Sequence, residues 1–196
     1  MPMERKASMR RALGIVGSPR RGGNTEVLVD EVLAGAQEAG AQIAKVILDE
    51  LDIRPCRACN ACQKAGKCAQ DDDMAALLEQ MQDSDLWVLG TPVYWWGPTA
   101  QFKAFVDRWY GARQVSFQGR QVIVVIPLGA GDAHYARHTV GMLTDALNYQ
   151  GARILATVLA PGVQGRGAVR SHATVLARAR QAGRDATMED AISMYG

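Results

Sequence analysis

Three short segments of the sequence carry the side chains that could do chemistry. Residues 17–25 read Gly-Ser-Pro-Arg-Arg-Gly-Gly-Asn-Thr, a loop rich in glycine, hydroxyl groups and positive charge. Residues 56–68 hold all four cysteines of the chain, and residues 91–98 hold three adjacent aromatic side chains. Segments of these kinds bind phosphate groups, metal ions and flat ring systems, respectively. The sequence therefore indicates a protein that holds cofactors.

The loop at 17–25 has the composition of a phosphate-binding turn. It lies between an apolar segment and a segment with helical spacing, so its backbone N–H groups and the helix dipole would point to one place. The residues predicted to bind a terminal phosphate are Ser18, Arg20, Arg21, Gly23, Asn24 and Thr25. The residues after Gly22 fit neither a triphosphate-binding loop nor a three-glycine dinucleotide fingerprint. A glycine-rich turn capped by Asn24 and Thr25 is the alternative to a binding site.

The four cysteines have the spacing C-x2-C-x2-C-x5-C. Bacterial ferredoxins use a similar C-x2-C-x2-C run for a [4Fe–4S] cluster, and a fourth cysteine after a short loop could close such a site. The predicted ligands are Cys56, Cys59, Cys62 and Cys68. Zinc is less favoured, because structural zinc sites usually pair two C-x2-C knuckles over a longer gap. Reduced thiols without metal are the other alternative. A disulfide framework is excluded, because every cysteine lies in this one segment.

The elements that must position these segments alternate between strands and helices. Strands are expected at residues 11–16, 43–48, 85–90, 121–128 and 153–159, and helices at 25–39, 74–81, 99–110, 135–150 and 171–182. The strands lack polar alternation, which indicates a parallel sheet covered on both faces. Five such units favour a flavodoxin-like, three-layer, doubly wound α/β fold with strand order 2-1-3-4-5. In this order the loops after the first and third strands meet, so a ligand is expected there.

The loop at 17–25 also resembles the FMN-phosphate loop of the NADPH-dependent FMN reductase superfamily. Residues 91–98, Thr-Pro-Val-Tyr-Trp-Trp-Gly-Pro, and residues 102–108, Phe-Lys-Ala-Phe-Val-Asp-Arg, look like that family's flavin-ring loop and the helix behind it. The resemblance covers essentially the whole chain. It implies FMN as the cofactor, with the flavin rather than any side chain carrying the chemistry.

The resemblance also indicates which residues lie at the flavin ring. Tyr94, Trp95 and Trp96 beside Gly97 offer a flat apolar wall and backbone groups for an isoalloxazine. A contact with another subunit is the alternative use of these aromatics. The loop at 129–135, after the fourth strand, is expected to add ring contacts. The residues expected at the ring are Thr91, Pro92, Val93, Tyr94, Trp95, Trp96, Gly97, Gly129 and Gly131.

The cysteine segment resembles the compact motif of the iron–sulfur flavoproteins, a branch of the same superfamily in which all four cysteines bind a [4Fe–4S] cluster. The resemblance implies an FMN-dependent oxidoreductase that carries electrons between small-molecule or redox-protein donors and acceptors, with NAD(P)H as a transient donor. Two alternatives stay open: a cluster-free NAD(P)H-dependent FMN or quinone reductase, and a non-enzymatic redox carrier or sensor. Relatives of this kind are commonly dimers or tetramers, so a homo-oligomer is expected.

Length and composition favour a single folded domain. The chain has 196 residues, of which 48% are hydrophobic, and a formal net charge of +2. This is enough for one core and gives little support to nucleic-acid binding. We expect a flexible arm at 1–10, one FMN-binding domain at 11–196 and a cysteine-loop insertion at 55–69. No apolar run reaches the ~20 residues that a membrane span needs, and the start is a poor signal peptide, so a cytoplasmic location is expected.

Overall fold

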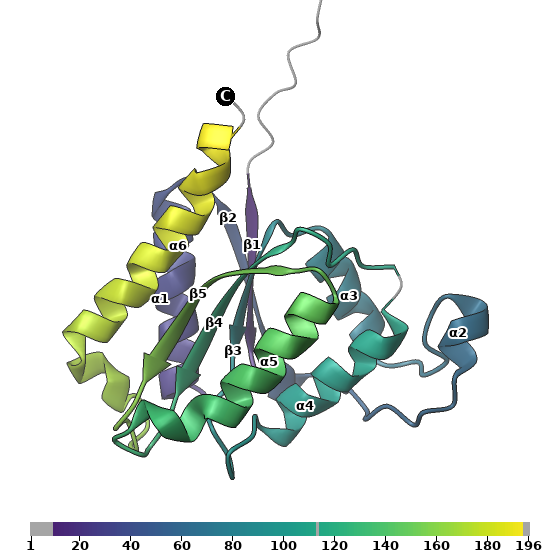
Figure 1. The fold of residues 1–196 in the computed structure, drawn as a ribbon, viewed down its shortest axis with the longest axis horizontal. Coiled ribbons are helices and arrows are strands. Elements are labelled where there is room, and N and C mark those ends of the chain that lie inside the picture. Colours follow the sequence, from purple (N-terminus) through teal and green to yellow (C-terminus); the bar gives the residue numbers. More distant parts are fainter. Residues whose placement is uncertain (1–9, 113, 194–196) are drawn as a thin grey trace, which may run out of the picture.

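A parallel sheet forms the centre of the computed structural model, which describes residues 10–112 and 114–193 (Figure 1). Its five strands are β1 (Arg11–Val16), β2 (Gln42–Ile47), β3 (Leu86–Gly90), β4 (Gln121–Pro127) and β5 (Arg153–Ala160). Their order is β2-β1-β3-β4-β5, and each neighbouring pair is parallel. The predicted fold class and strand order are therefore confirmed. Because all strands run the same way, all their carboxyl ends lie at one edge of the sheet.

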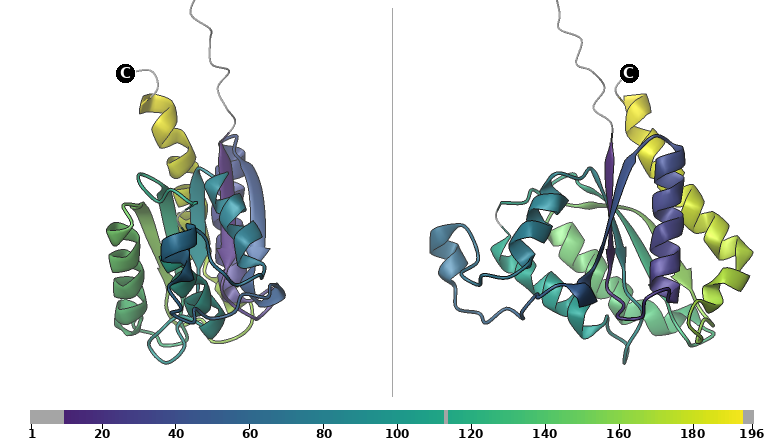
Figure 2. Two further views of the ribbon diagram at one scale, coloured as in Figure 1. Left: turned by 90° about the vertical axis from the view of Figure 1, so that its right-hand side faces the viewer. Right: turned by 180° about the vertical axis from the view of Figure 1, so that it is seen from behind.

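Helices cover both faces of the sheet, as the two views in Figure 2 show. One face is covered by α1 (Asn24–Glu38) and α6 (Ala173–Ser193), and the other by α3 (Met74–Gln82), α4 (Ala100–Asp107) and α5 (Arg137–Tyr149). The short turns are η1 (Leu48–Glu50), η2 (Arg108–Gly111), η3 (Ala133–Ala136) and η4 (Ala168–Ser171). A further short helix, α2 (Ala61–Ala65), lies in the cysteine segment, apart from both layers (Figure 1). In the described part of the chain, no helix is long and apolar enough to cross a bilayer.

Some elements differ from those predicted. The helix expected from residue 135 begins as the turn η3, where the Asp132 carboxylate accepts a hydrogen bond from the backbone of His134 at 2.8 Å. The helix α2 was not predicted, because five residues are too few to show a helical period. Residues 1–9 of the predicted arm lie outside the described residues. Arg10, assigned to that arm, is part of the fold, because its guanidinium donates to Gln121 Oε1 at 2.7 Å.

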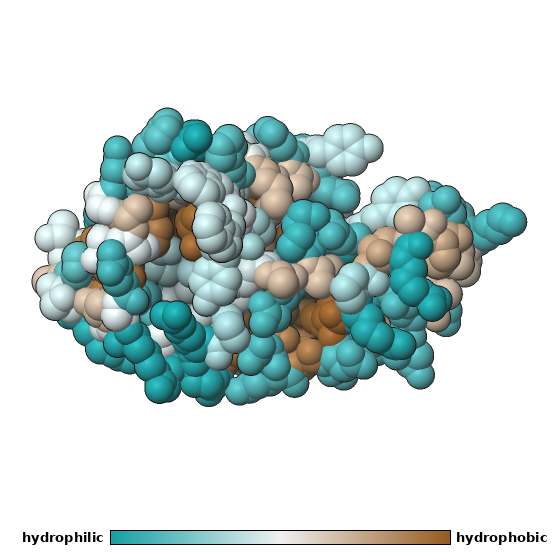
Figure 3. Space-filling view, turned by 90° about the horizontal axis from the view of Figure 1, so that it is seen from below, coloured by the Kyte–Doolittle hydropathy of each residue, from teal (hydrophilic) through white to brown (hydrophobic). Residues whose placement is uncertain are grey.

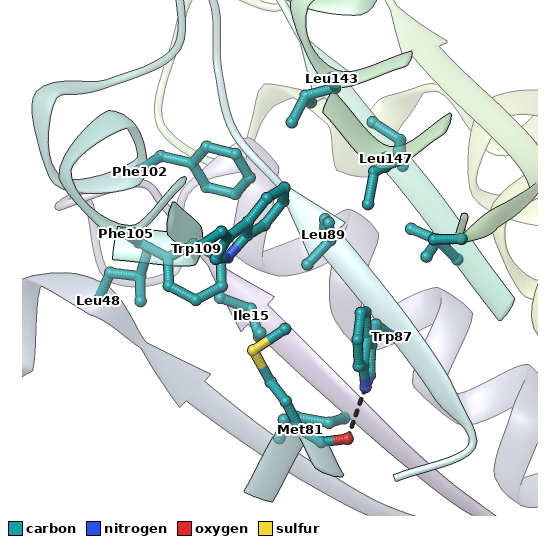
Figure 4. Close-up of a cluster of buried hydrophobic side chains, with 14 of the residues drawn as sticks. Ile15, Leu48, Met81, Trp87, Leu89, Phe102, Phe105, Trp109, Leu143 and Leu147 are labelled. Atoms are coloured by element: carbon teal, nitrogen blue, oxygen red, sulfur yellow. Dashed lines mark hydrogen bonds between the residues drawn. The ribbon is translucent and has the colours of Figure 1, made fainter. Parts of the chain in front are cut away.

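A chain of buried aromatic rings fixes α4 and η2 to the sheet (Figure 4). The rings of Phe102 and Phe105 meet edge to face with centroids 5.9 Å apart, and those of Phe105 and Trp109 with centroids 5.4 Å apart. Trp87 of β3 lies in the same core and donates its indole N–H to the carbonyl of Met81 at 2.9 Å. Such pairs add stabilisation beyond the area they bury. The segment formed by α4 and η2 is therefore held to the sheet from Phe102 to Trp109.

The other face depends on two glycines, where α1 and α6 touch backbone to backbone. A Cβ atom added at Gly35 would lie 1.8 Å from the carbonyl oxygen of Arg180, and one added at Gly183 would lie 1.9 Å from that of Val32. Neither distance can be relieved by a side-chain rotation, because the atoms met are backbone. The close approach of the two helices therefore requires glycine at both positions.

We predict that Gly35→Ala destabilises the protein, because the added methyl group forces α1 away from α6. Overpacking of this kind costs about 1–3 kcal/mol, which exceeds the gain of roughly 1 kcal/mol in helix propensity. The matched control is Gly141→Ala in α5, where an added Cβ meets nothing within 4 Å and should stabilise by about 0.5–1 kcal/mol. Urea unfolding measures both. Equal or higher stability for Gly35→Ala would contradict the helix packing described.

Candidate cofactor site

The loop between β1 and α1 opens into a cavity of about 210 Å³ at the carboxyl edge of the sheet. From this loop, the residues that line the cavity are Ser18, Arg20, Asn24 and Thr25. The first backbone hydrogen bond within α1 runs from Val27 N–H to Gly23 O. The N–H groups of residues 24–26 precede this bond, at the positive end of the helix dipole. This end of the cavity is therefore built to accept an anion.

A buried carboxylate shapes the same loop from behind. Glu26, only 6% exposed, accepts hydrogen bonds from Gly22 N–H at 2.6 Å and from Lys45 Nζ at 2.9 Å. Burial alone would raise the pKa of Glu26, but these two hydrogen bonds and the charges of Lys45 and Arg21 hold it below its ordinary value. Arg21 Nη1 lies 3.6 Å from Glu26 Oε1 and 3.3 Å from Glu50 Oε1. The two cations thus offset a negative charge that would otherwise oppose a bound anion.

Two buried threonines join this loop to the loop after β3. Thr99 caps α4 by accepting a hydrogen bond from Phe102 N–H at 3.3 Å, and its hydroxyl donates to the carbonyl of Gly17. Thr91 Oγ1 in turn accepts from Thr99 N–H at 3.2 Å. A Cβ atom at Gly17 would lie 2.5 Å from the Phe102 ring, so this crossing needs glycine. The first and third loops are consequently held together as one unit.

The aromatic loop after β3 is a tight turn with two tryptophans at its tip. Tyr94 and Gly97 exchange both backbone hydrogen bonds, at 2.8 and 3.0 Å. Trp95 and Trp96, which lie between Tyr94 and Gly97, have φ angles of +46° and +63°. These angles are in the left-handed region, which residues other than glycine and asparagine rarely adopt. Thr139 of α5 donates its hydroxyl to the carbonyl of Trp96 at 3.1 Å, which steadies the turn. Trp95 is 90% exposed.

A second cavity of about 250 Å³ leads from the anion-binding end to these tryptophans. Val93, Leu128 and Gly129 line both cavities, so the two form one groove. The far end is lined by Trp95, Trp96, Ala130 and Tyr135. Figure 3 shows this face of the molecule, with apolar side chains in brown between polar ones. One end of the groove suits an anionic tail, and the other suits a flat apolar ring.

The structure brings two thirds of the predicted cofactor residues to this groove. Those that line it are Ser18, Arg20, Asn24, Thr25, Pro92, Val93, Tyr94, Trp95, Trp96 and Gly129. Those that do not line it are Arg21, Gly23, Thr91, Gly97 and Gly131. Thr91 is fully buried and holds its loop to Thr99. Its hydroxyl therefore serves the loop rather than the groove.

Asn24 has a different function from the one predicted for its amide. Its Nδ2 donates to the carbonyls of Val163 and Gly165, at 2.8 and 2.9 Å. Its Oδ1 accepts from Val169 N–H at 3.0 Å. The amide thus fastens the loop after β5 to the start of α1, and both of its donated hydrogen bonds go to that loop.

Sequence reasoning did not name four residues that line the groove, which are Pro127, Leu128, Val163 and Gln164. Val163 and Gln164 line the anion-binding end, in a loop for which no cofactor contact was predicted. A signal existed, because the loop after a fifth parallel strand also ends at the carboxyl edge. Glu26 was also missed, although it stands three residues after the N-cap Gly23, a position from which a carboxylate can reach back to the backbone before a helix.

The cysteine segment forms a loop with a closed base. Asp52 and Asp73 exchange hydrogen bonds at 2.7 and 3.0 Å, and Gln70 Nε2 donates to the carbonyl of Pro55 at 3.1 Å. All four cysteines line one pocket within the loop, but its volume is only about 20 Å³. Among residues 10–112 and 114–193, no three His, Cys, Asp or Glu side chains are grouped closely enough to hold a metal ion. The four predicted ligands therefore line one pocket, but their side chains are not grouped around a common point.

A buried ion pair fixes the wall of this pocket. Arg108, 3% exposed, contacts both carboxylate oxygens of Asp72, at 2.6 and 3.0 Å. Asp72 also accepts from the backbone of Arg54 at 3.2 Å and, more weakly, from that of Met74 at 3.3 Å. Burial alone would raise the pKa of Asp72, but Arg108 and these backbone bonds lower it. Asp72, which lies just before α3, therefore serves mainly as the partner of Arg108.

Together, the doubly wound sheet and the groove at its switch point define a flavodoxin-like α/β protein with a candidate binding site at the carboxyl edge of the sheet. The description of the family model that matches residues 10–164 is NADPH-dependent FMN reductase. The chain belongs to this family.

Similar proteins include two iron–sulfur flavoproteins. One from Methanocaldococcus jannaschii is 41% identical over 98 residues, which cover 50% of this chain and 51% of that protein. One from Archaeoglobus fulgidus is 39% identical over 105 residues, which cover 53% of this chain and 48% of that protein. The chain spans about half the length of the curated relatives it matches. Among solved structures, a flavone reductase has the same fold, with a TM-score of 0.71 and 21% identity over 93% of this chain and 64% of that one.

We predict that Glu26→Gln weakens the acid dependence of stability. The lowered pKa means that ionised Glu26 stabilises the fold above its ordinary value of 4.5, and that this contribution is lost as the pH falls through the folded-state value. At pH 7 the substitution should cost about 1–3 kcal/mol, because buried donors lose a charged partner. The difference between wild type and variant should shrink below pH 4.5. Unfolding at several pH values, with exposed Glu79→Gln as control, measures this; a pH-independent difference would contradict it.

Proposed function

We propose that this protein is an FMN-dependent oxidoreductase of the iron–sulfur flavoprotein type. The observation that carries the proposal is the single groove with an anion-binding end at α1 and an aromatic end at the tryptophan turn. FMN has the matching parts, a phosphate tail and a flat ring. Family membership favours FMN over other mononucleotides. Bound FMN supplies the electron chemistry, while the protein supplies binding and orientation.

At the anion-binding end, two hydroxyl groups are placed to donate to a phosphate. Ser18 Oγ accepts from Arg20 N–H at 3.2 Å, which leaves its own proton for a ligand. Thr25, almost fully buried, lines the same cavity from the first turn of α1. Arg20 adds a positive charge at the rim. We assign these three side chains, with the helix N–H groups, to the phosphate.

At the aromatic end, the residues that line the cavity provide shape rather than acid–base chemistry. Apart from Tyr135, they are Val93, Trp95, Trp96, Leu128, Gly129 and Ala130, which have no ionisable side chain. The rings of Trp96 and Tyr135 lie with centroids 6.4 Å apart and can contact a flat ligand together. We therefore assign no catalytic side chain in the described residues, so the flavin would carry the chemistry.

We further propose that Cys56, Cys59, Cys62 and Cys68 hold a [4Fe–4S] cluster, which would supply one-electron transfer. Their spacing, their common pocket and the names of two similar proteins support this. So does Gly111, where an added Cβ would lie 3.2 Å from the Cβ and 3.4 Å from the sulfur of Cys62. A pocket of about 20 Å³ has room for about one water molecule. Loading a cluster therefore requires the exposed segment with Cys56 and Cys59 to move outward.

A cluster-free NAD(P)H-dependent FMN or quinone reductase is the second candidate. The observation that favours it is that the cysteines do not converge in the described structure. In either case, we propose NAD(P)H as a transient donor over the flavin. The free cysteines agree with a reducing compartment such as the cytoplasm. The exposed Trp95 at the rim of the groove supports a homo-oligomer, because aromatic residues are enriched at subunit interfaces.

We predict that the double substitution Ser18→Ala and Thr25→Ala weakens FMN binding at least ~100-fold, since each hydrogen bond to a charged group contributes about 1.5–3 kcal/mol. Riboflavin has the same ring without the phosphate, so its affinity should not change. Fluorescence titration of the apoprotein with both ligands measures the two effects. The exposed Ser116→Ala serves as control. Unaltered FMN affinity, or equal losses for FMN and riboflavin, would contradict the assignment of the phosphate end.

We predict that protein purified without oxygen contains iron and acid-labile sulfide in equal amounts, and that Cys62→Ala loses both while keeping FMN. The reason is that Cys62 is the buried member of the four cysteines and lies away from the groove. Metal and sulfide assays beside the flavin spectrum measure this. A flavin-loaded, iron-free wild type would leave the cluster-free reductase as the function. Rapid NAD(P)H oxidation without an added protein would count against a pure electron carrier.

A further inference from the structure

One buried donor near the cysteines is left without a partner. The guanidinium of Arg108 has five N–H groups. Its Nη atoms donate to Asp72 and to the carbonyl of Arg54, but its Nε has no hydrogen-bond partner. An unsatisfied buried donor is unfavourable, and more so when it carries charge. This N–H is therefore left to donate to an acceptor in the pocket that Arg108 lines.

The sulfur of Cys68 is the candidate acceptor for this N–H. Arg108 lines the cysteine pocket together with Cys68. Burial opposes its charge, but Asp72, and to a smaller extent the Cys68 sulfur, raise the pKa of Arg108. Thiolate ligands of iron–sulfur clusters accept hydrogen bonds, which adjust the reduction potential of the cluster.

Asp72 prevents the guanidinium from turning away. The Asp72 side chain is fully buried, and its two carboxylate oxygens each accept a hydrogen bond from one Nη atom of Arg108. Its negative charge also neutralises Arg108, so the pair presents a fixed N–H dipole rather than a net charge. Gly111, in the same turn η2, lies against Cys62 and Cys68. Arg108 and Gly111 of η2 therefore both line the cysteine pocket.

We propose that Arg108 donates its Nε–H to the sulfur of Cys68 when that thiolate is an iron ligand, and so raises the reduction potential of the cluster. The inference rests on the proposed function, because it needs the cluster. Reduction adds one electron from an external reductant to the cluster, no bond to Arg108 breaks, and its proton stays on Nε. The added negative charge strengthens the hydrogen bond, which favours the reduced state. Arg108 is therefore a positioning residue.

The test compares Arg108→Gln and Arg108→Lys with wild type, using the full chain reconstituted with iron and sulfide under anaerobic conditions. Reductive titration followed by electron paramagnetic resonance gives the midpoint potential. We expect Arg108→Gln to disfavour reduction about tenfold, which is 59 mV for one electron. Arg108→Lys keeps the charge but loses the fixed N–H, so its potential should also fall. Lys64→Gln removes an exposed charge from the same loop and should change little. An unchanged potential in both Arg108 variants would overturn the proposal.

A second measurement needs no variant to fold. Wild-type protein labelled with 15N-arginine should show coupling of an arginine nitrogen to the electron spin of the reduced cluster in pulsed spectra. A cluster without such coupling would overturn the role of Arg108 and leave the proposed function intact. If the wild type takes up no iron at all, the cluster assignment itself fails, and this inference fails with it.

Discussion

The helix formed by α4 and η2 is the rigid element on which both candidate sites depend. At its N-cap, Thr99 donates its hydroxyl to the carbonyl of Gly17 and so holds the loop at 17–25. At its end, Arg108 binds Asp72 and closes the base of the cysteine loop. Between these ends, buried rings dock it on the sheet. At about 1.5 Å per residue, Thr99 and Arg108 are roughly 14 Å apart along this segment, so one packed element sets the spacing of the two candidate sites.

Two buried carboxylates have parallel tasks, one in each site. Glu26 accepts a hydrogen bond from the backbone of the loop at 17–25, and Asp72 accepts from the backbone on both sides of the cysteine segment. Each is matched by cations, Lys45 with Arg21 in one case and Arg108 in the other. A loop that presents N–H groups or thiols outward cannot pair all of its own backbone N–H groups within the loop. A buried carboxylate has several acceptor positions and can accept hydrogen bonds from them on the inner side of the loop. In both candidate sites the ionised acids fix the geometry of the loop.

Those parts of the fold and site that depend on local pattern could be predicted from the sequence. Apolar runs located the strands, and the composition of residues 17–25 located the anion-binding end of the groove. Contacts between distant segments could not be predicted. The amide of Asn24 holds a loop about 140 residues away, and Thr91 is turned into the protein by Thr99. Nothing near Arg108 in the sequence indicates that Asp72 is its partner. Such pairings are decided by packing, which a single sequence does not display.

The turn at Trp95 and Trp96 has a consequence for any attempt to engineer the protein. Both residues have a backbone shape that Asn-Gly would adopt without strain, so the native pair gives up stability, about 1–3 kcal/mol at each position, to place two indoles at the rim of the groove. A screen for heat resistance alone would select Asn-Gly here. The selected variants would be more stable but would lack the two indoles that line the far end of the groove. A measurement of stability alone would not detect that change.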